Sequence, residues 1–142
     1  MKLVEIGKNI LTNCMNVKPG ENILIVTDDE KYAIGQTLYQ AAKLLKAEAM
    51  LMTMTAREVS GQEPPAVVAA AMKAADVVIC PMKTSITHTR AKIEAAEAGA
   101  RIATMPGITE EMFAMGAMTT DYSRVMALTE QVTDLLTNAN TA

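Results

Sequence analysis

Hydrophobic and polar positions along the chain follow two alternating patterns. Six segments place apolar residues three or four positions apart, as amphipathic helices do. Four shorter segments between them are apolar almost throughout, which is typical of strands buried on both faces. The predicted helices span residues 3–15, 31–46, 66–75, 88–98, 109–115 and 121–137. The predicted strands span residues 22–27, 48–54, 76–80 and 101–105. In the last helix, one face is shared by Tyr122, Val125, Met126, Thr129, Val132, Leu135 and Leu136.

Helices that alternate with apolar strands predict a parallel sheet covered on both faces. Right-handed crossovers then give a three-layer α/β/α sandwich of the Rossmann or flavodoxin-like type, with a four-stranded parallel sheet. We expect the strand order 2-1-3-4 by analogy with other doubly wound folds, because periodicity does not determine it. A chain of 142 residues fits one α/β domain that covers residues 1–142.

In open α/β sheets, ligands bind beyond the carboxyl ends of the strands. The most polar segment at that edge follows the third predicted strand and contains the chain's one histidine. Hydroxyls, cations and an imidazole in front of a helix N-terminus suit a phosphate or a carboxylate. The candidate anion-binding residues are Lys83, Thr84, Ser85, Thr87, His88 and Arg90. The structural alternative is that Ser85 or Thr87 caps the helix and Arg90 faces water.

Two acidic residues after the first predicted strand, Asp28 and Asp29, join the candidate set. Thr27 and Glu30 have the spacing of a capping box, so a structural role at a helix N-terminus is the alternative. The same acidic residues disfavour a bound nucleotide, because its phosphates would meet like charge. The sequence also lacks the glycine-rich signatures of NAD-binding and ATP-binding loops.

The sequence has one histidine and two cysteines, Cys14 and Cys80, with no CxxC or HExxH pair. A catalytic zinc site usually needs three protein ligands, so we expect no metal site in this chain. Cys80 and His88 would form a nucleophile if paired as thiolate and imidazole, but packing is the commoner role of such a cysteine. Two cysteines make no disulfide framework, which favours a reduced, cytoplasmic protein.

The composition of the chain disfavours some classes of binding partner. A net charge of -3 and 3% aromatic residues disfavour nucleic acid. No stretch approaches the roughly 18 apolar residues of a membrane span, so no membrane partner is expected. The chain has 12 methionines. Those of the strand at 48–54 are expected in the core, whereas those between 112 and 118 could continue onto the surface and dock another domain or a second copy.

Four segments carry a resemblance that covers nearly the whole chain in order. They are residues 17–28 (VKPGENILIVTD), 56–65 (AREVSGQEPP), 83–91 (KTSITHTRA) and 98–109 (AGARIATMPGIT). Together they resemble the N-terminal domain of the aminopeptidase T family of thermophilic, leucyl aminopeptidase-like metalloproteases. That resemblance implies a cytosolic, dimeric, two-domain enzyme with two divalent metals of the zinc or cobalt type. The metal ligands and catalytic residues of that family lie in the C-terminal domain, to which no segment here corresponds.

On this resemblance, we expect the chain to be a non-catalytic N-terminal domain, either a fragment or a stand-alone homologue. Its parent would remove N-terminal amino acids from peptides, and its partners would be its own C-terminal domain and a second copy. The polar tail at 138–142 would then mark a domain boundary. Three alternatives stay open: a small-anion binding module, a structural oligomerisation unit, and a domain of a related iron-dependent dioxygenase that opens dihydroxypyridine rings.

Overall fold

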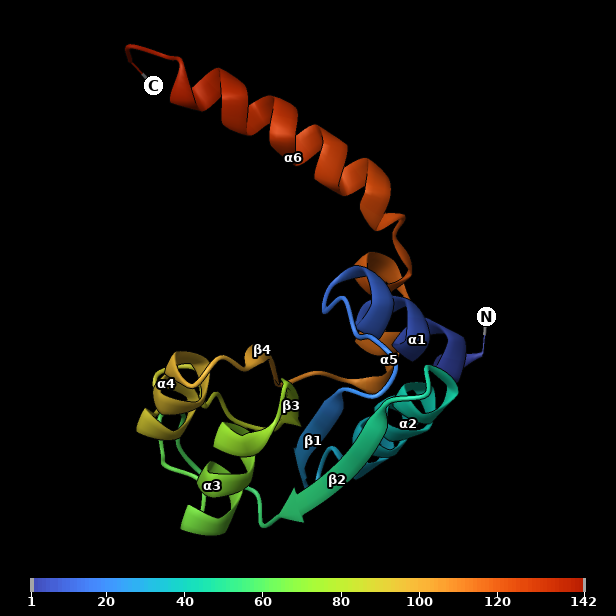
Figure 1. Ribbon diagram of the computed structural model, residues 1–142, viewed down its shortest axis with the longest axis vertical. Helices are drawn as coiled ribbons and strands as arrows, with labels where there is room; N and C mark the ends of the chain where they lie inside the picture. The colour runs from blue at the N-terminus through green and yellow to red at the C-terminus, as the bar shows by residue number, and fades with distance from the viewer. Residues whose placement is uncertain (1, 142) are drawn as a thin grey trace.

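The computed structural model describes residues 2–141, and its central layer is a parallel sheet (Figure 1). The strands are β1 (Asn22–Asp28), β2 (Glu48–Met54), β3 (Val77–Met82) and β4 (Arg101–Pro106). Their order, β2-β1-β3-β4, confirms both the expected order and the expected fold class. In the central strand β1, Ile23 lies in register with Ala49 of β2 and Val77 of β3.

Alternate residues of β1 face two separate cores, because successive side chains of a strand point to opposite faces. Ile23 and Ile25 pack in one core, and Leu24 and Val26 pack in the other, all at most 2% exposed. The first core is covered by α1 (Leu3–Asn13), α2 (Tyr32–Leu44) and α5 (Glu110–Ala114). The second core is covered by α3 (Ala66–Ala74) and α4 (Arg90–Glu97). Burial on both faces explains why this strand is apolar without interruption.

Helix α2 lies close to the carboxyl end of β1, and a glycine permits that approach. A Cβ atom at Gly35 would lie 2.8 Å from Cγ2 of Thr27, closer than real Cβ atoms come. The missing side chain therefore lets the helix pack directly on the strand from which the candidate site extends.

Strand β2 is an edge strand and is less buried than its apolar sequence predicts. Met54 is buried and Met52 is half-buried, but Met50 exposes 42% of its surface. The expectation that all three fill the core is wrong for Met50. The reason is topological, since β2 has one neighbouring strand and a hollow separates it from α3.

The chain ends in α5, the short 3-10 helix η1 (Gly116–Thr119) and the long helix α6 (Tyr122–Thr137). Figure 1 shows α6 projecting from the three layers into solvent, and none of its residues is buried. The apolar face predicted for this helix is therefore uncovered. Met112 and Met115 are exposed, as expected, whereas Met118 packs against the first core. Within residues 2–141, no helix combines the length and the apolar character needed to cross a membrane.

Each predicted helix and strand is present, and its ends lie within two residues of the predicted ones. Two differences matter for the candidate site. Helix α2 begins at Tyr32 rather than Lys31, and α4 begins at Arg90 rather than His88. The N-cap residues of these two helices therefore differ from the predicted ones.

Candidate functional site

Three loops meet at the carboxyl edge of the sheet. The loops after β1 and β3 are neighbours because these two strands pair. The segment at 55–65, between β2 and α3, is held to the loop after β3 by two hydrogen bonds. The N–H of Gly61 donates to the carbonyl of Ser85 at 2.8 Å, and the N–H of Ser85 donates to the hydroxyl of Ser60 at 3.1 Å.

Asp28 lies at the centre of this edge and is fully buried. Its Oδ1 accepts hydrogen bonds from the backbone N–H groups of Glu30 and Lys31, at 3.1 and 3.0 Å. Its Oδ2 accepts one from the N–H of Lys83 at 2.6 Å. The structure thus brings the predicted site residues Asp28 and Lys83 together. The carboxylate of Asp28 connects the loop after β1 to the loop after β3.

The predicted capping box of Thr27 with Glu30 is wrong. Thr27 belongs to β1, and its hydroxyl donates to the carbonyl of Pro81 at 2.9 Å. Helix α2 begins later, and its N-cap residue Lys31 makes no side-chain capping bond. The acidic loop is still structural, because Asp28 binds two of its amides and Asp29 accepts from the N–H of Ala56 at 2.9 Å.

The ammonium group of Lys83 is held between two carboxylates. Its Nζ lies 3.0 Å from Oε1 of Glu30 and 3.8 Å from Oε2 of Glu58. The hydrogen bond to Glu30, and then the charges of Glu30 and Glu58, raise the pKa of Lys83 above its ordinary value. Lys83 is therefore charged at neutral pH, and an external anion would share it with both glutamates.

Hydroxyl groups form a short chain that begins in the same loop as Lys83. The hydroxyl of Ser85 donates to that of Thr87 at 2.9 Å, and Thr87 lies 3.0 Å from the hydroxyl of Thr104 on β4. Thr84 is half-buried in the same loop. The structure therefore brings Ser85 and Thr87 together and adds Thr104, which the sequence did not single out.

The N-terminus of α4 is closed by two residues outside the predicted set. Thr89 is the N-cap, with its hydroxyl accepting from the N–H of Lys92 at 3.3 Å. The carboxylate of Glu63 accepts from the N–H groups of Arg90, at 2.6 Å, and Ala91, at 3.3 Å. The alternative that Ser85 or Thr87 caps this helix is wrong, because the helix starts later than predicted.

The two remaining predicted residues, His88 and Arg90, are exposed at the surface. The guanidinium of Arg90 pairs with Glu94 one turn along the helix, at 3.3 Å. Anion binding by the loop at 83–90 stays a prediction, with the qualification that Glu63 already occupies two of the amides it would use. Local sequence gives no signal for Glu63, which lies 27 residues before Arg90.

Cys80 is not placed for nucleophilic chemistry. It is 1% exposed and packs in the second core, whereas His88 faces solvent. Burial raises the pKa of Cys80 to about 12, so its thiol stays protonated at neutral pH. Cys80 therefore fits a packing role, with its side chain extending from β3 into the second core.

Histidine, cysteine, aspartate and glutamate side chains are the usual protein ligands of divalent metals. Within residues 2–141, no group of three or more histidine, cysteine, aspartate or glutamate side chains is arranged to hold a metal ion. Asp28, the most buried carboxylate of the candidate site, is engaged with backbone N–H groups at both of its oxygens.

The structure also has an apolar hollow of about 750 Å³, away from the candidate residues. It runs along the edge strand β2, and Tyr39 of α2 and the alanines at the end of α3 form its other walls. Its lining carries no charged side chain. Its chemistry therefore suits apolar contact and not the anion predicted for the loop at 83–90.

Comparison with known proteins supports the fold. No protein-family model and no curated protein matches this sequence. The 2,5-dihydroxypyridine dioxygenase of Pseudomonas putida has a similar structure, with a TM-score of 0.59 and 16% identity, over 73% of this chain and 33% of that one. AmpT (aminopeptidase T) of Thermus thermophilus has a TM-score of 0.50 and 12% identity, over 73% of this chain and 35% of that one. At such identities the likeness shows the fold alone. The chain spans about a third of the length of each enzyme, and it is similar in fold to part of a dioxygenase and part of an aminopeptidase.

Proposed function

We propose that this chain is a non-catalytic α/β domain of a metal-dependent aminopeptidase-like protein, which removes N-terminal amino acids from peptides. The supporting observation is that the same fold recurs in about a third of two enzymes named for different reactions. A fold found in both enzymes cannot by itself determine either reaction. The residues specific to the reaction are therefore expected in the remaining two thirds of such a protein.

The choice of an aminopeptidase rests on the four segments that resemble the aminopeptidase T family. A divalent metal of the zinc or cobalt type would be held by a C-terminal domain, and that domain would be the partner of this one. The parent protein would be cytoplasmic. The polar groups at the carboxyl edge suit such a supporting role, because Asp28, Asp29 and Glu63 all bind backbone amides of neighbouring loops.

A second candidate is the same role in an iron-dependent, ring-opening dioxygenase. The observation behind this candidate is that the dioxygenase shares the fold, with a TM-score of 0.59 against 0.50 for AmpT. The two candidates share the non-catalytic role of the domain and differ in the reaction of its partner.

The test has two parts. The 142-residue chain is assayed for hydrolysis of leucine p-nitroanilide with added Zn²⁺ or Co²⁺, and we expect no activity. The natural polypeptide is then identified in its own cells with an antibody and mass spectrometry. We expect a mass well above 15.2 kDa, together with leucine p-nitroanilide hydrolysis that a chelator abolishes.

Hydrolysis by the 142-residue chain alone would overturn the non-catalytic role. A natural mass near 15.2 kDa would overturn the two-domain parent. Cleavage of 2,5-dihydroxypyridine with Fe²⁺ by the longer protein, without peptidase activity, would select the second candidate.

A further inference from the structure

Strand β2 has no neighbouring strand on its outer side within residues 2–141. In a parallel pair, alternate residues direct both backbone groups toward the neighbouring strand, and the residues between them direct both groups away. The N–H of Glu48 donates to the carbonyl of Glu21 at 2.9 Å, so Glu48 faces β1. At the other end of the strand, the carbonyl of Met54 accepts from the N–H of Asp29 at 3.1 Å, so Met54 also faces β1. The residues of β2 that direct their N–H and C=O groups outward are therefore Ala49, Leu51 and Thr53.

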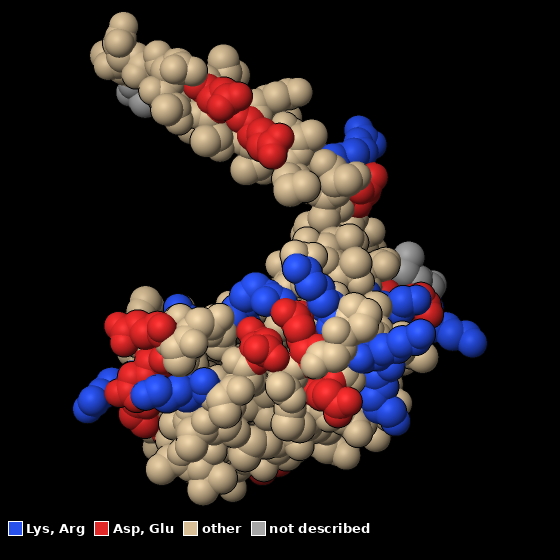
Figure 2. Space-filling model, in the orientation of Figure 1, with Lys and Arg blue, Asp and Glu red and all other residues tan. Residues whose placement is uncertain are grey.

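The apolar hollow of about 750 Å³ lies along this free edge. It is lined by residues 49–52 of β2, whose successive side chains point to opposite faces of the sheet. One wall is Tyr39 of α2, which covers the first core, and the other is formed by alanines at the end of α3, which covers the second core. Figure 2 shows a largely uncharged surface over α3 and the end of β2, in the lower part of the view. The free edge therefore lies between apolar walls on both faces of the sheet.

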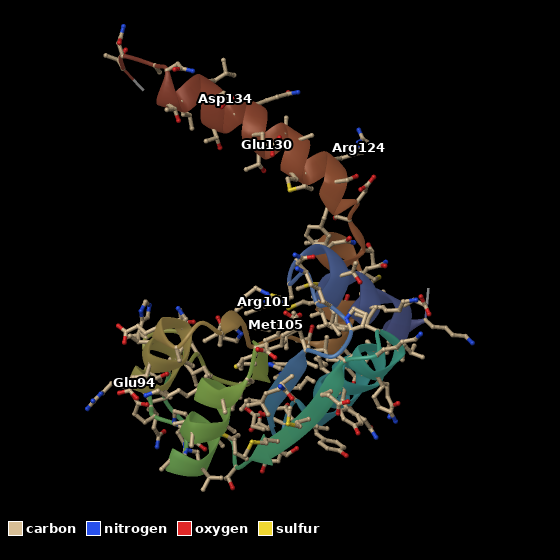
Figure 3. The ribbon with its side chains drawn as sticks, viewed as in Figure 1. Glu94, Arg101, Met105, Arg124, Glu130 and Asp134 are labelled. Atoms are coloured by element: carbon tan, nitrogen blue, oxygen red, sulfur yellow. The ribbon has the colours of Figure 1, made fainter. Side chains whose placement is uncertain are left out.

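The two edges of the sheet differ in their protection. Sheets usually guard a free edge with charged side chains, proline or a covering segment. The other edge strand, β4, begins with Arg101 and ends with Pro106, and Figure 3 labels Arg101 at its start. Strand β2 contains neither lysine nor proline, and its one charged residue, Glu48, is its first. The outward backbone groups of β2 are therefore open to pairing with another strand.

The charges beside the hollow indicate which occupant fits. Each helix that forms a wall carries one lysine and no acidic residue. In α2, the ammonium group of Lys43 lies 5.5 Å from the centre of the Tyr39 ring. In α3, Lys73 is exposed next to Ala74. A second copy of the chain would bring the same lysines to this edge, whereas a peptide with acidic residues would bring opposite charge.

We propose that β2 binds an extended peptide segment of another protein, apolar at its centre and acidic at its ends, which adds to the four-stranded sheet as a further strand. Outward N–H and C=O groups that recur at every second residue match the backbone repeat of a strand, whereas a helix uses its backbone groups internally. The apolar walls suit uncharged side chains at successive positions of the peptide. The outward groups run from Ala49 to Thr53, so about five residues of the peptide would pair with them. Helix α6 carries the chain away from this edge (Figure 1), and the proposal does not depend on the proposed function.

The probe is a peptide of about seven residues, blocked at both ends, with alternating valine and alanine between two glutamates. It is titrated into the isotope-labelled chain from about 10 µM to 1 mM, a range suited to a short main-chain contact. We expect binding to slow amide hydrogen exchange at Ala49, Leu51 and Thr53. The control peptide has N-methyl groups on two consecutive central residues, which removes a donor from each edge of the peptide strand. It should bind at least about tenfold more weakly, because it loses backbone hydrogen bonds although the methyl groups make it more apolar.

Two substitutions at one position give a matched test in the chain itself. Leu51→Pro removes an outward N–H, at a place in an edge strand where proline is tolerated, and Leu51→Ala keeps that N–H. Both variants lose the same leucine side chain from the hollow. We expect Leu51→Pro to bind the probe peptide at least about tenfold more weakly than Leu51→Ala does. Circular dichroism verifies that both variants fold, and the N-methylated peptide decides the question if Leu51→Pro does not.

Equal binding of the probe peptide and its N-methylated form would overturn the proposal, and so would an absence of binding up to about 1 mM. Without peptide, exchange at the three outward amides that slows as the protein concentration rises would assign the edge to a second copy. Exchange that is already slow in the free natural polypeptide would assign the edge to a strand of the same chain. Either of these results would also overturn the proposal. None of them bears on the proposed function, which the peptidase assay and the natural mass decide.

Discussion

The carboxylate of Glu63 closes the N-terminus of α4, with Oε1 accepting a hydrogen bond from the N–H of Arg90 at 2.6 Å. Its other oxygen accepts from the N–H of Ala91 at 3.3 Å. A helix N-terminus favours negative charge because its first N–H groups point outward and the helix dipole is positive there. The sequence predicts an external phosphate or carboxylate at this end, and the chain places one of its own carboxylates at the same two amides. An external anion and Glu63 would therefore compete.

Glu63→Ala is expected to expose that competition. Loss of two partly exposed hydrogen bonds should lower the free energy of unfolding by about 1 kcal/mol. The freed N–H groups, with Arg90 at the same helix start, should then let phosphate raise the melting temperature more in the variant than in the unmodified chain. Thermal unfolding with and without phosphate measures both effects.

The control is Glu97→Ala, which removes the same charge from the other end of α4. It should leave the response to phosphate unchanged. If phosphate stabilises Glu63→Ala no more than the unmodified chain, the loop at 83–90 is not an anion site.

Asp28→Ala is expected to be among the most damaging single changes at this edge. The substitution leaves the backbone N–H groups of Glu30 and Lys83 without their acceptor in a partly buried place. The N–H of Lys31 loses the carboxylate and keeps only the backbone carbonyl of residue 28. The expected loss is about 3 kcal/mol in the free energy of unfolding, measured by urea titration. Asp29→Ala is the matched control. Asp29 is exposed and accepts one bond, so its loss should cost about 1 kcal/mol. Equal losses in the two variants would contradict the bracing role of Asp28.

The sequence predicts the fold well because the signals of fold are local. Strand β1 is apolar over consecutive positions, and α2 and α6 have clear helical spacing. The strand order came from analogy with similar folds, and the structure confirms it. The predicted order already makes β2 an edge strand, but its apolar sequence does not show that the helices leave Met50 partly uncovered beside the hollow next to α3.

The candidate site is harder to predict because its bonds join distant parts of the chain. The sequence does not distinguish Thr89 from Ser85 and Thr87 as the N-cap of α4, since any of these three hydroxyl residues within five positions can cap a helix. The bond from Lys83 to Asp28 spans 55 positions, and that from Arg90 to Glu63 spans 27. Neither the periodicity of a segment nor the spacing of its residues indicates a contact between positions so far apart in the chain.

Arg101→Ala is expected to weaken the fold in a way that depends on pH. The guanidinium of Arg101 donates to the carbonyls of Met15 and Asn16 and pairs with Glu21 at 2.7 Å. The hydrogen bond from Arg101 lowers the pKa of Glu21 below its ordinary value of 4.5. The folded state then binds fewer protons than the unfolded state, so the contribution of the pair is complete above pH 4.5 and is lost as the pH falls through the folded pKa.

The difference in stability between the unmodified chain and Arg101→Ala should be about 1 kcal/mol at pH 7, since the pair is partly exposed. The part of it that comes from Glu21 should shrink in acid, and urea titrations at pH 7 and near pH 3 measure the change. Glu48→Ala, an exposed glutamate of the edge strand β2, serves as the control for acid unfolding in general. A difference that grows in acid would contradict the pairing.

The two cysteines should react at very different rates with a disulfide reagent such as dithionitrobenzoate. Thiolates are the attacking species, and burial raises the pKa of Cys80 to about 12, so almost none is present at pH 8. Cys14 is exposed at the end of α1. The native protein should therefore release one equivalent of chromophore quickly and the second at the slow rate at which the core opens. Cys14→Ser should remove the fast phase, and guanidinium should make the remaining thiol react at once. Two fast equivalents from the native chain would show that β3 does not bury Cys80.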